Sequence, residues 1–83
     1  MSTKEKLLER FRRLPGDFTF DELIRLFSIF GFELDNKGRT SGSRVLFYKN
    51  EECFAMHRPH PGNIVRKAVL KEVYNYLYIK GLL

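Results

Sequence analysis

The chain has 83 residues, of which 43% are hydrophobic, and this is enough to bury the core of one small domain spanning residues 1–83. No apolar run is long enough to cross a bilayer and the N-terminus is charged, so we expect a cytoplasmic protein with no membrane partner. The net charge of +5 is concentrated in residues 37–83, whose nine basic and three acidic side chains indicate a polyanionic partner such as nucleic acid.

The first predicted helix occupies most of residues 1–16. Ser2 and Glu5 have the spacing of a capping box, in which each side chain bonds a free backbone N–H of the first turn. Apolar residues then recur at helical intervals as far as Leu14. Proline and glycine at positions 15 and 16 end the helix, so residues 1–16 form an extra helix and turn ahead of a core of residues 17–83.

A second helix is predicted between Thr19 and Gly31. Thr19 and Glu22 again have capping-box spacing, and Phe18 has the position to pack on Leu23 across the cap. Apolar residues then repeat every three or four positions, which gives the helix one buried face. Gly31 ends it, because glycine readily adopts the left-handed backbone that follows many helices.

After Gly31 the apolar residues alternate with polar ones, which is the period of a strand. Strands are predicted over residues 32–35, 43–49 and 52–58, with a loop over residues 36–42. Asn50 and the glutamate after it form a tight turn, because asparagine tolerates positive φ. In an antiparallel hairpin that turns there, Arg44 lies opposite His57, within cross-strand contact distance.

A run rich in proline and glycine, residues 59–62, ends the sheet. Asn63 is then the expected N-cap of a last helix that runs to about Lys80, and Gly81 closes it. The order α-α-β-β-β-α predicts an α+β fold, with a three-stranded antiparallel sheet and helices packed on one face.

This order resembles the double-stranded-RNA-binding-domain-like fold, and several segments between about residues 17 and 80 resemble the HicA toxin family of bacterial toxin–antitoxin pairs. The occurrence of all these segments in the family's order is more specific for the family than any single segment. The segments are Asp17-Phe18-Thr19-Phe20-Asp21-Glu22-Leu23, Gly31-Phe32, Lys37-Gly38-Arg39-Thr40-Ser41-Gly42-Ser43-Arg44-Val45, His57-Arg58-Pro59-His60-Pro61-Gly62-Asn63 and Leu70-Lys71-Glu72-Val73.

The resemblance implies a small endoribonuclease that cleaves mRNA and is neutralised by a HicB-type antitoxin. An acidic antitoxin can cover a basic surface electrostatically. Well-studied members of the family carry a catalytic histidine directly after a Gly-Ser pair on the second strand, where this chain has Arg44 after Gly42-Ser43. Two hypotheses therefore stand side by side: a metal-independent endoribonuclease toxin, and a non-catalytic RNA- or antitoxin-binding module with the same fold.

The candidate catalytic residues are His57, His60 and Arg44. Metal-free RNA cleavage needs a base for the 2′-hydroxyl proton, an acid for the leaving 5′-oxygen and a cation for the developing phosphorane charge. Imidazole exchanges protons near neutral pH, so two histidines can share the acid and base roles. The alternatives are a solvated polar sheet face for Arg44 and His57, and a turn histidine bonded to backbone for His60.

Further cations are candidate RNA contacts, because lysine and arginine bind backbone phosphates. Solvated loops and helix faces carry such residues as well, so the two readings stay open. Tyr74 and Tyr78, four residues apart, suit either base stacking or helix packing. The candidate RNA-binding residues are Lys37 and Arg39 in the loop, Arg58 at the end of the third strand, and Lys67 and Lys71 in the last helix.

No metal or other cofactor is expected. The chain has two histidines and one cysteine, with no close cluster of His, Asp and Glu around them. It also has no glycine-rich motif of the kind that cradles phosphates and no recognisable Ser/His/Asp arrangement. Cys53 is interpreted as a small strand residue rather than a nucleophile.

Overall fold

The computed structural model describes residues 3–35, 44–59 and 62–83. Its elements follow the predicted order α-α-β-β-β-α, and the three strands form one antiparallel sheet in the order β1-β2-β3. The predicted α+β fold is therefore confirmed. The elements are α1 (Thr3–Arg12), α2 (Phe20–Ile29), β1 (Glu33–Asp35), β2 (Arg44–Lys49), β3 (Glu52–His57) and α3 (Lys67–Ile79).

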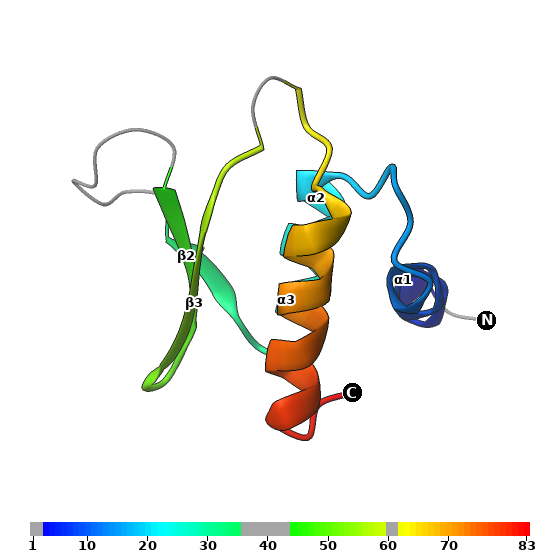
Figure 1. The fold of residues 1–83 in the computed structure, drawn as a ribbon. Helices are drawn as coiled ribbons and strands as arrows, with labels where there is room; N and C mark the ends of the chain where they lie inside the picture. Colours follow the sequence, from blue (N-terminus) through cyan, green and yellow to red (C-terminus); the bar gives the residue numbers. More distant parts are fainter. Residues whose placement is uncertain (1–2, 36–43, 60–61) are drawn as a thin grey trace.

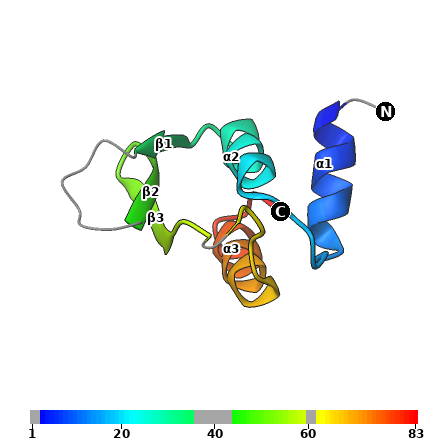
Figure 2. The ribbon, with the colours of Figure 1, turned by 90° about the horizontal axis from the view of Figure 1, so that it is seen from above.

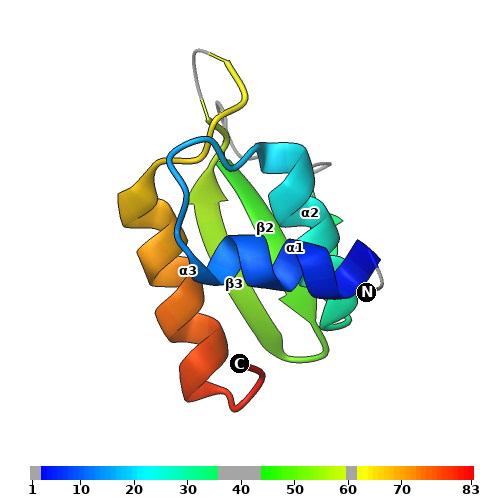
Figure 3. The same cartoon turned by 90° about the vertical axis from the view of Figure 1, so that its right-hand side faces the viewer.

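The molecule has three layers, which Figures 1 and 2 show edge-on. The sheet is the first layer, α2 and α3 lie side by side on one of its faces, and α1 lies on the far side of that helix pair. Figure 3 shows α1 running across α2 and α3 rather than along them. The two inner helices thus separate α1 from the sheet.

The core lies between the sheet and the inner helices and continues under α1. Phe27 of α2 stacks on Phe47 of β2 with ring centroids 4.1 Å apart, which joins the two layers at their centre. Phe11 is the buried residue of α1, and its ring lies 5.7 Å from Phe18 and 5.9 Å from Tyr74. Buried apolar residues are Phe11, Phe18, Phe20, Leu23, Leu26, Phe27, Phe32, Val45, Phe47, Met56, Val65, Leu70, Val73 and Leu77.

The capping box of α2 forms as predicted. The Glu22 backbone N–H donates to the Thr19 hydroxyl oxygen at 3.1 Å, and the Thr19 backbone N–H donates to the Glu22 carboxylate at 2.9 Å. Arg10 of α1 reaches the same carboxylate at 2.8 Å and Asp17 at 3.0 Å. The cap therefore also ties α1 to α2. The other predicted cap rests on Ser2, which lies outside the described residues.

The ends of the elements differ from the predicted ones by one or two residues at several places. The first helix ends at Arg12 instead of Leu14, because Leu14 takes a left-handed φ of 49° and turns the chain. Gly31 has a φ of 88° and ends α2 as predicted. The hairpin turn also forms as predicted, with Asn50 at a φ of 55°.

The prediction that Asn63 caps the last helix is wrong. The helix begins at Lys67, with Arg66 as its N-cap residue. Ile64 instead forms an isolated antiparallel bridge with Thr19, in which the Phe20 N–H donates to the Asn63 carbonyl at 2.8 Å and the Val65 N–H donates to the Phe18 carbonyl at 2.7 Å. The Asn63 side chain is used in another contact, as a donor to Asp21 at 3.3 Å.

Candidate nucleic-acid interface

The hairpin brings Arg44 and His57 together. The register pairs Arg44 with His57 at one end and Lys49 with Glu52 at the other, as the predicted turn requires. Directly opposed residues on one sheet face have Cβ atoms about 4.5–5.5 Å apart. Both side chains are exposed, whereas their neighbours Val45 and Met56 point into the core and fix the strands.

A cavity of about 340 Å³ opens beside His57, between the end of β3 and the start of α3. Its lining combines apolar residues from both sides with a cationic residue on each side, Arg58 and Arg66. This combination suits a ligand with a flat apolar part and negative charge. The lining residues are Met56, His57, Arg58, Pro59, Ile64, Val65, Arg66 and Val69.

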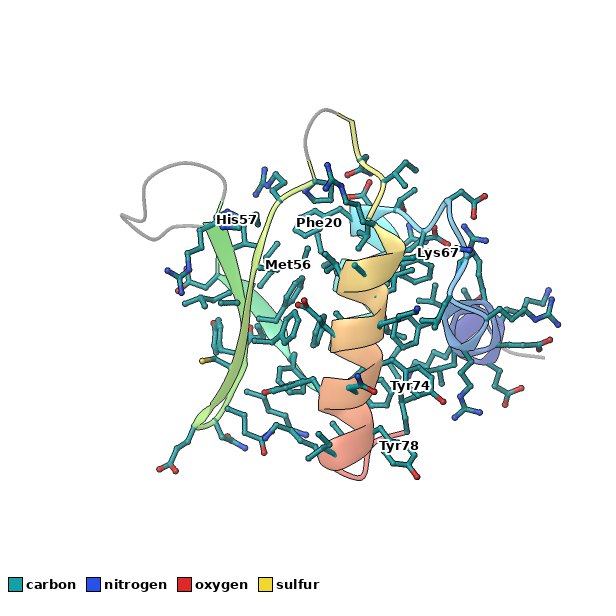
Figure 4. All side chains as sticks on the ribbon, in the orientation of Figure 1. Phe20, Met56, His57, Lys67, Tyr74 and Tyr78 are labelled. Atoms are coloured by element: carbon teal, nitrogen blue, oxygen red, sulfur yellow. The ribbon has the colours of Figure 1, made fainter. Side chains whose placement is uncertain are left out.

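Of the predicted RNA-binding residues that the structure describes, Arg58 lies in this cavity. Its guanidinium carbon is 5.5 Å from the centroid of the Phe20 ring, a cation–π arrangement. Phe20 is 4% exposed at the start of α2, so it is a fixed support. Figure 4 shows Phe20 and Met56 below the segment that leaves β3, with His57 beside them on the sheet. Because Arg58 is exposed, this contact favours its position by only about 0.5–1 kcal/mol.

Arg66 is a cavity residue that the sequence interpretation missed as a ligand contact. With the helix predicted to start at Asn63, Arg66 falls on an ordinary exposed helix face. In the structure it is the N-cap residue of α3, and among the described residues its side chain makes no capping hydrogen bond. The signal was the pair Ile64-Val65, because β-branched residues favour extended backbone and so argue for a later helix start.

Lys67 does not join the cavity. Figure 4 places it on the side of α3 that faces away from the sheet. Its Cε would lie 3.7 Å from a Cβ atom added at Gly16, so its side chain runs beside the connection between α1 and α2. Lys71 is exposed one turn further along α3.

Tyr74 and Tyr78 also lie on the side of α3 away from the sheet (Figure 4). Tyr74 stacks on Phe11, and its ring is 6.5 Å from that of Tyr78. Packing against α1 thus accounts for Tyr74, and Tyr78 remains 63% exposed. Neither tyrosine lines the cavity.

Three predicted site residues, Lys37, Arg39 and His60, lie outside the described residues, as does the Gly42-Ser43 pair. The described ranges contain no group of three or more His, Cys, Asp or Glu side chains that could hold a metal ion. Within these ranges, too, no helix has the length and apolar character needed to cross a membrane.

Among the described residues, pKa values are shifted for Arg10, Glu22 and Tyr76, and none of the three lines the cavity. The hydrogen bond from Arg10 holds the pKa of Glu22 below its usual value. Burial raises the pKa of Tyr76, whose hydroxyl donates to the Cys53 carbonyl at 3.2 Å. Both groups join packed elements, Glu22 between α1 and α2 and Tyr76 between α3 and β3. Cys53 itself is exposed.

The family model described as the HicA toxin of bacterial toxin–antitoxin matches residues 20–79. This segment runs from the start of α2 to the end of α3, so it contains the sheet, both inner helices and the cavity, and it leaves out α1. Comparisons with curated proteins and with solved structures gave no significant match. Because the match covers well over half of the chain, the protein belongs to the HicA toxin family.

Proposed function

We propose that the protein is the endoribonuclease toxin of a type II toxin–antitoxin system and that it cleaves mRNA without a metal ion. The observation that carries the proposal is the pairing of Arg44 with His57, which itself lines a cationic cavity. A guanidinium and an imidazole on one exposed face provide a phosphate ligand and a proton carrier. The RNA substrate is consistent with the +5 net charge.

Each candidate catalytic residue has one role in the proposed reaction. One histidine of the pair His57 and His60 takes the proton of the 2′-hydroxyl, and the 2′-oxygen forms a bond to phosphorus. The bond to the 5′-oxygen breaks, and the second histidine donates a proton to that oxygen. Arg44 stabilises the negative charge on the phosphorane oxygens. The products are a 2′,3′-cyclic phosphate and a free 5′-hydroxyl.

The remaining candidate cations bind the RNA strand in this proposal. Arg58 lies next to His57 and holds a phosphate near the cleaved bond. Lys67 and Lys71, on the other side of α3, bind a more distant part of the strand, and Lys37 and Arg39 contact phosphates from the loop. Such contacts give affinity rather than sequence preference.

The partners and setting follow from the same proposal. A HicB-type antitoxin, acidic where it meets the toxin, covers the basic surface around Arg44 and His57 and blocks RNA access. An mRNA substrate places the protein in the cytoplasm. We further propose that residues 1–83 act as one HicA-like domain, in which residues 1–16 form a leader and residues 17–83 the core.

The second candidate function is a non-catalytic RNA- or antitoxin-binding module. Arg44 favours it, because well-studied HicA proteins carry a catalytic histidine directly after the Gly-Ser pair. In that case His57 binds phosphate but transfers no proton. The protein then shifts RNA in a binding assay and leaves it intact.

Purified protein incubated with single-stranded RNA and excess EDTA separates the two functions. We expect cleavage by the natural chain, a loss of roughly 10²–10⁴-fold in rate for His57→Ala, and a loss of about 10²-fold or more for Arg44→Ala. Glu51→Gln, exposed in the hairpin turn, is the matched control and should cleave normally. Intact RNA with the natural chain, or full activity in the double variant His57→Ala/His60→Ala, would overturn the catalytic proposal.

A further inference from the structure

We propose that the cavity between β3 and α3 holds one unpaired nucleotide of single-stranded RNA, beside the bond to be cleaved. The inference rests on the proposed function and adds to it a substrate class and a binding position. The cavity borders His57, so its occupant lies next to the proposed reacting phosphate. A protein with this pocket selects single-stranded RNA over a duplex.

The size of the cavity fits a single nucleotide. Its volume of about 340 Å³ lies at the lower end of the range of roughly 300–1,000 Å³ that small-molecule sites cover. That end of the range suits one base with its sugar rather than a stack of several.

The apolar lining suits the face of a base. Met56 and Val65 are 8% and 1% exposed and form fixed walls, whereas Ile64 is 46% exposed although it is a large aliphatic side chain. Val69, half-buried on the first turn of α3, completes the wall. Bases in single strands stack on apolar, aromatic or guanidinium surfaces. An exposed Ile64 at the cavity is accounted for by such a contact.

The cations stand on both sides of this lining. His57 ends β3 and Arg58 follows it, whereas Arg66 directly precedes α3, so phosphates on the two sides of one nucleotide each find a partner. As far as the described residues form the lining, it contains no acidic side chain. The N–H groups of the first turn of α3 add positive potential at the same edge.

The position of the cavity explains the preference for a single strand. A base in a duplex is stacked and paired, and extruding it costs a few kcal/mol. In an A-form duplex the exposed surface is mainly phosphate and 2′-hydroxyl groups. An apolar pocket therefore gains little from a duplex, whereas a single strand can place a base in it directly.

The natural chain has no tryptophan, so Ile64→Trp places a single fluorescent reporter at the cavity. The probe is a short 2′-O-methyl RNA, which cannot be cleaved through its 2′-oxygen. We expect quenching by the single strand and at least tenfold weaker binding of the same sequence as a duplex at equal salt. Equal quenching and equal affinity for both forms would overturn the inference.

Arg66→Ala and Arg12→Ala form a matched pair that each remove one positive charge. Arg66 lines the cavity, whereas Arg12 is exposed on α1, beyond the inner helices. We expect Arg66→Ala to weaken single-strand binding by about tenfold. The slope of log affinity against log salt concentration should fall by the amount expected for about one lost phosphate contact. Arg12→Ala should change both far less. Equal losses in the two variants would indicate binding by net charge and contradict a nucleotide pocket.

Amide spectra of the natural chain supply a measurement that needs no substitution. Adding the single-stranded 2′-O-methyl probe should shift the signals of Met56 and of residues 64–69 most strongly. Cleavage of RNA without these shifts would refute the pocket and leave the nuclease standing. Strong shifts without cleavage of ordinary RNA would refute the nuclease and leave the pocket standing.

Discussion

Replacing Phe11 by alanine tests how α1 is held to the rest of the protein. Phe11 is 0% exposed and packs against Phe18 and Tyr74. Truncating a buried phenylalanine costs about 3–5 kcal/mol, since the lost apolar contact adds to the cavity that remains. A domain of this size has a total stability of roughly 4–12 kcal/mol. The variant is therefore expected to be close to the limit of folding.

Urea unfolding followed by circular dichroism measures this loss. Two results are compatible with the packing: a lower midpoint at an unchanged slope, or a smaller slope if α1 detaches and leaves α2, α3 and the sheet folded. Arg12→Ala is the matched control on the same helix, because Arg12 is exposed and its loss should change stability by less than about 0.5 kcal/mol. A loss below about 1 kcal/mol in Phe11→Ala would refute the packing of α1 described above.

Two further predictions concern the caps and turns. Arg10 lowers the pKa of Glu22, so the contribution of the Glu22 carboxylate to stability is complete above about pH 4.3 and is lost as the pH falls through the lower pKa of the folded state. In thermal unfolding between pH 7 and pH 3, Glu22→Gln should therefore lose less stability with falling pH than the natural chain does. An identical loss in the two proteins would contradict the Arg10 contact. Asn50 has a φ of 55°, so Asn50→Ala should lose about 1 kcal/mol in urea unfolding while Asn50→Gly stays within a few tenths, and equal losses would show that backbone strain is not the cause.

The sheet was predictable because alternation and turn chemistry agree. Val45 and Phe47 are buried on one face, and the turn at Asn50 leaves one register, so Arg44 opposite His57 follows from the sequence alone. The start of α3 was not predictable from local signals. Asn63 is a good N-cap residue, but backbone hydrogen bonds tie residues 63 and 65 to Phe18 and Phe20, more than 40 residues away, and the helix starts only after them.

The part of the candidate site that lies on the hairpin was also predictable from local patterning. Local patterning finds Arg44, His57 and Arg58, which lie at one end of the hairpin. It cannot find the cavity, whose second wall is Ile64, Val65 and the first turn of α3. Arg66 joins the site only because that turn starts late. Sequence spacing alone also does not show that Lys67 lies outside the site, on the side of α3 that faces away from the sheet.

We propose above that the chain's own side chains cleave RNA through the 2′-hydroxyl of the substrate. An RNA with one cleavage position, and the same RNA with a 2′-deoxynucleotide there, test it in excess EDTA. We expect a 2′,3′-cyclic phosphate on the cut RNA, and binding without cleavage for the deoxy-substituted strand. Cleavage of the substituted strand at that position, or 3′-hydroxyl ends on the products, would contradict it.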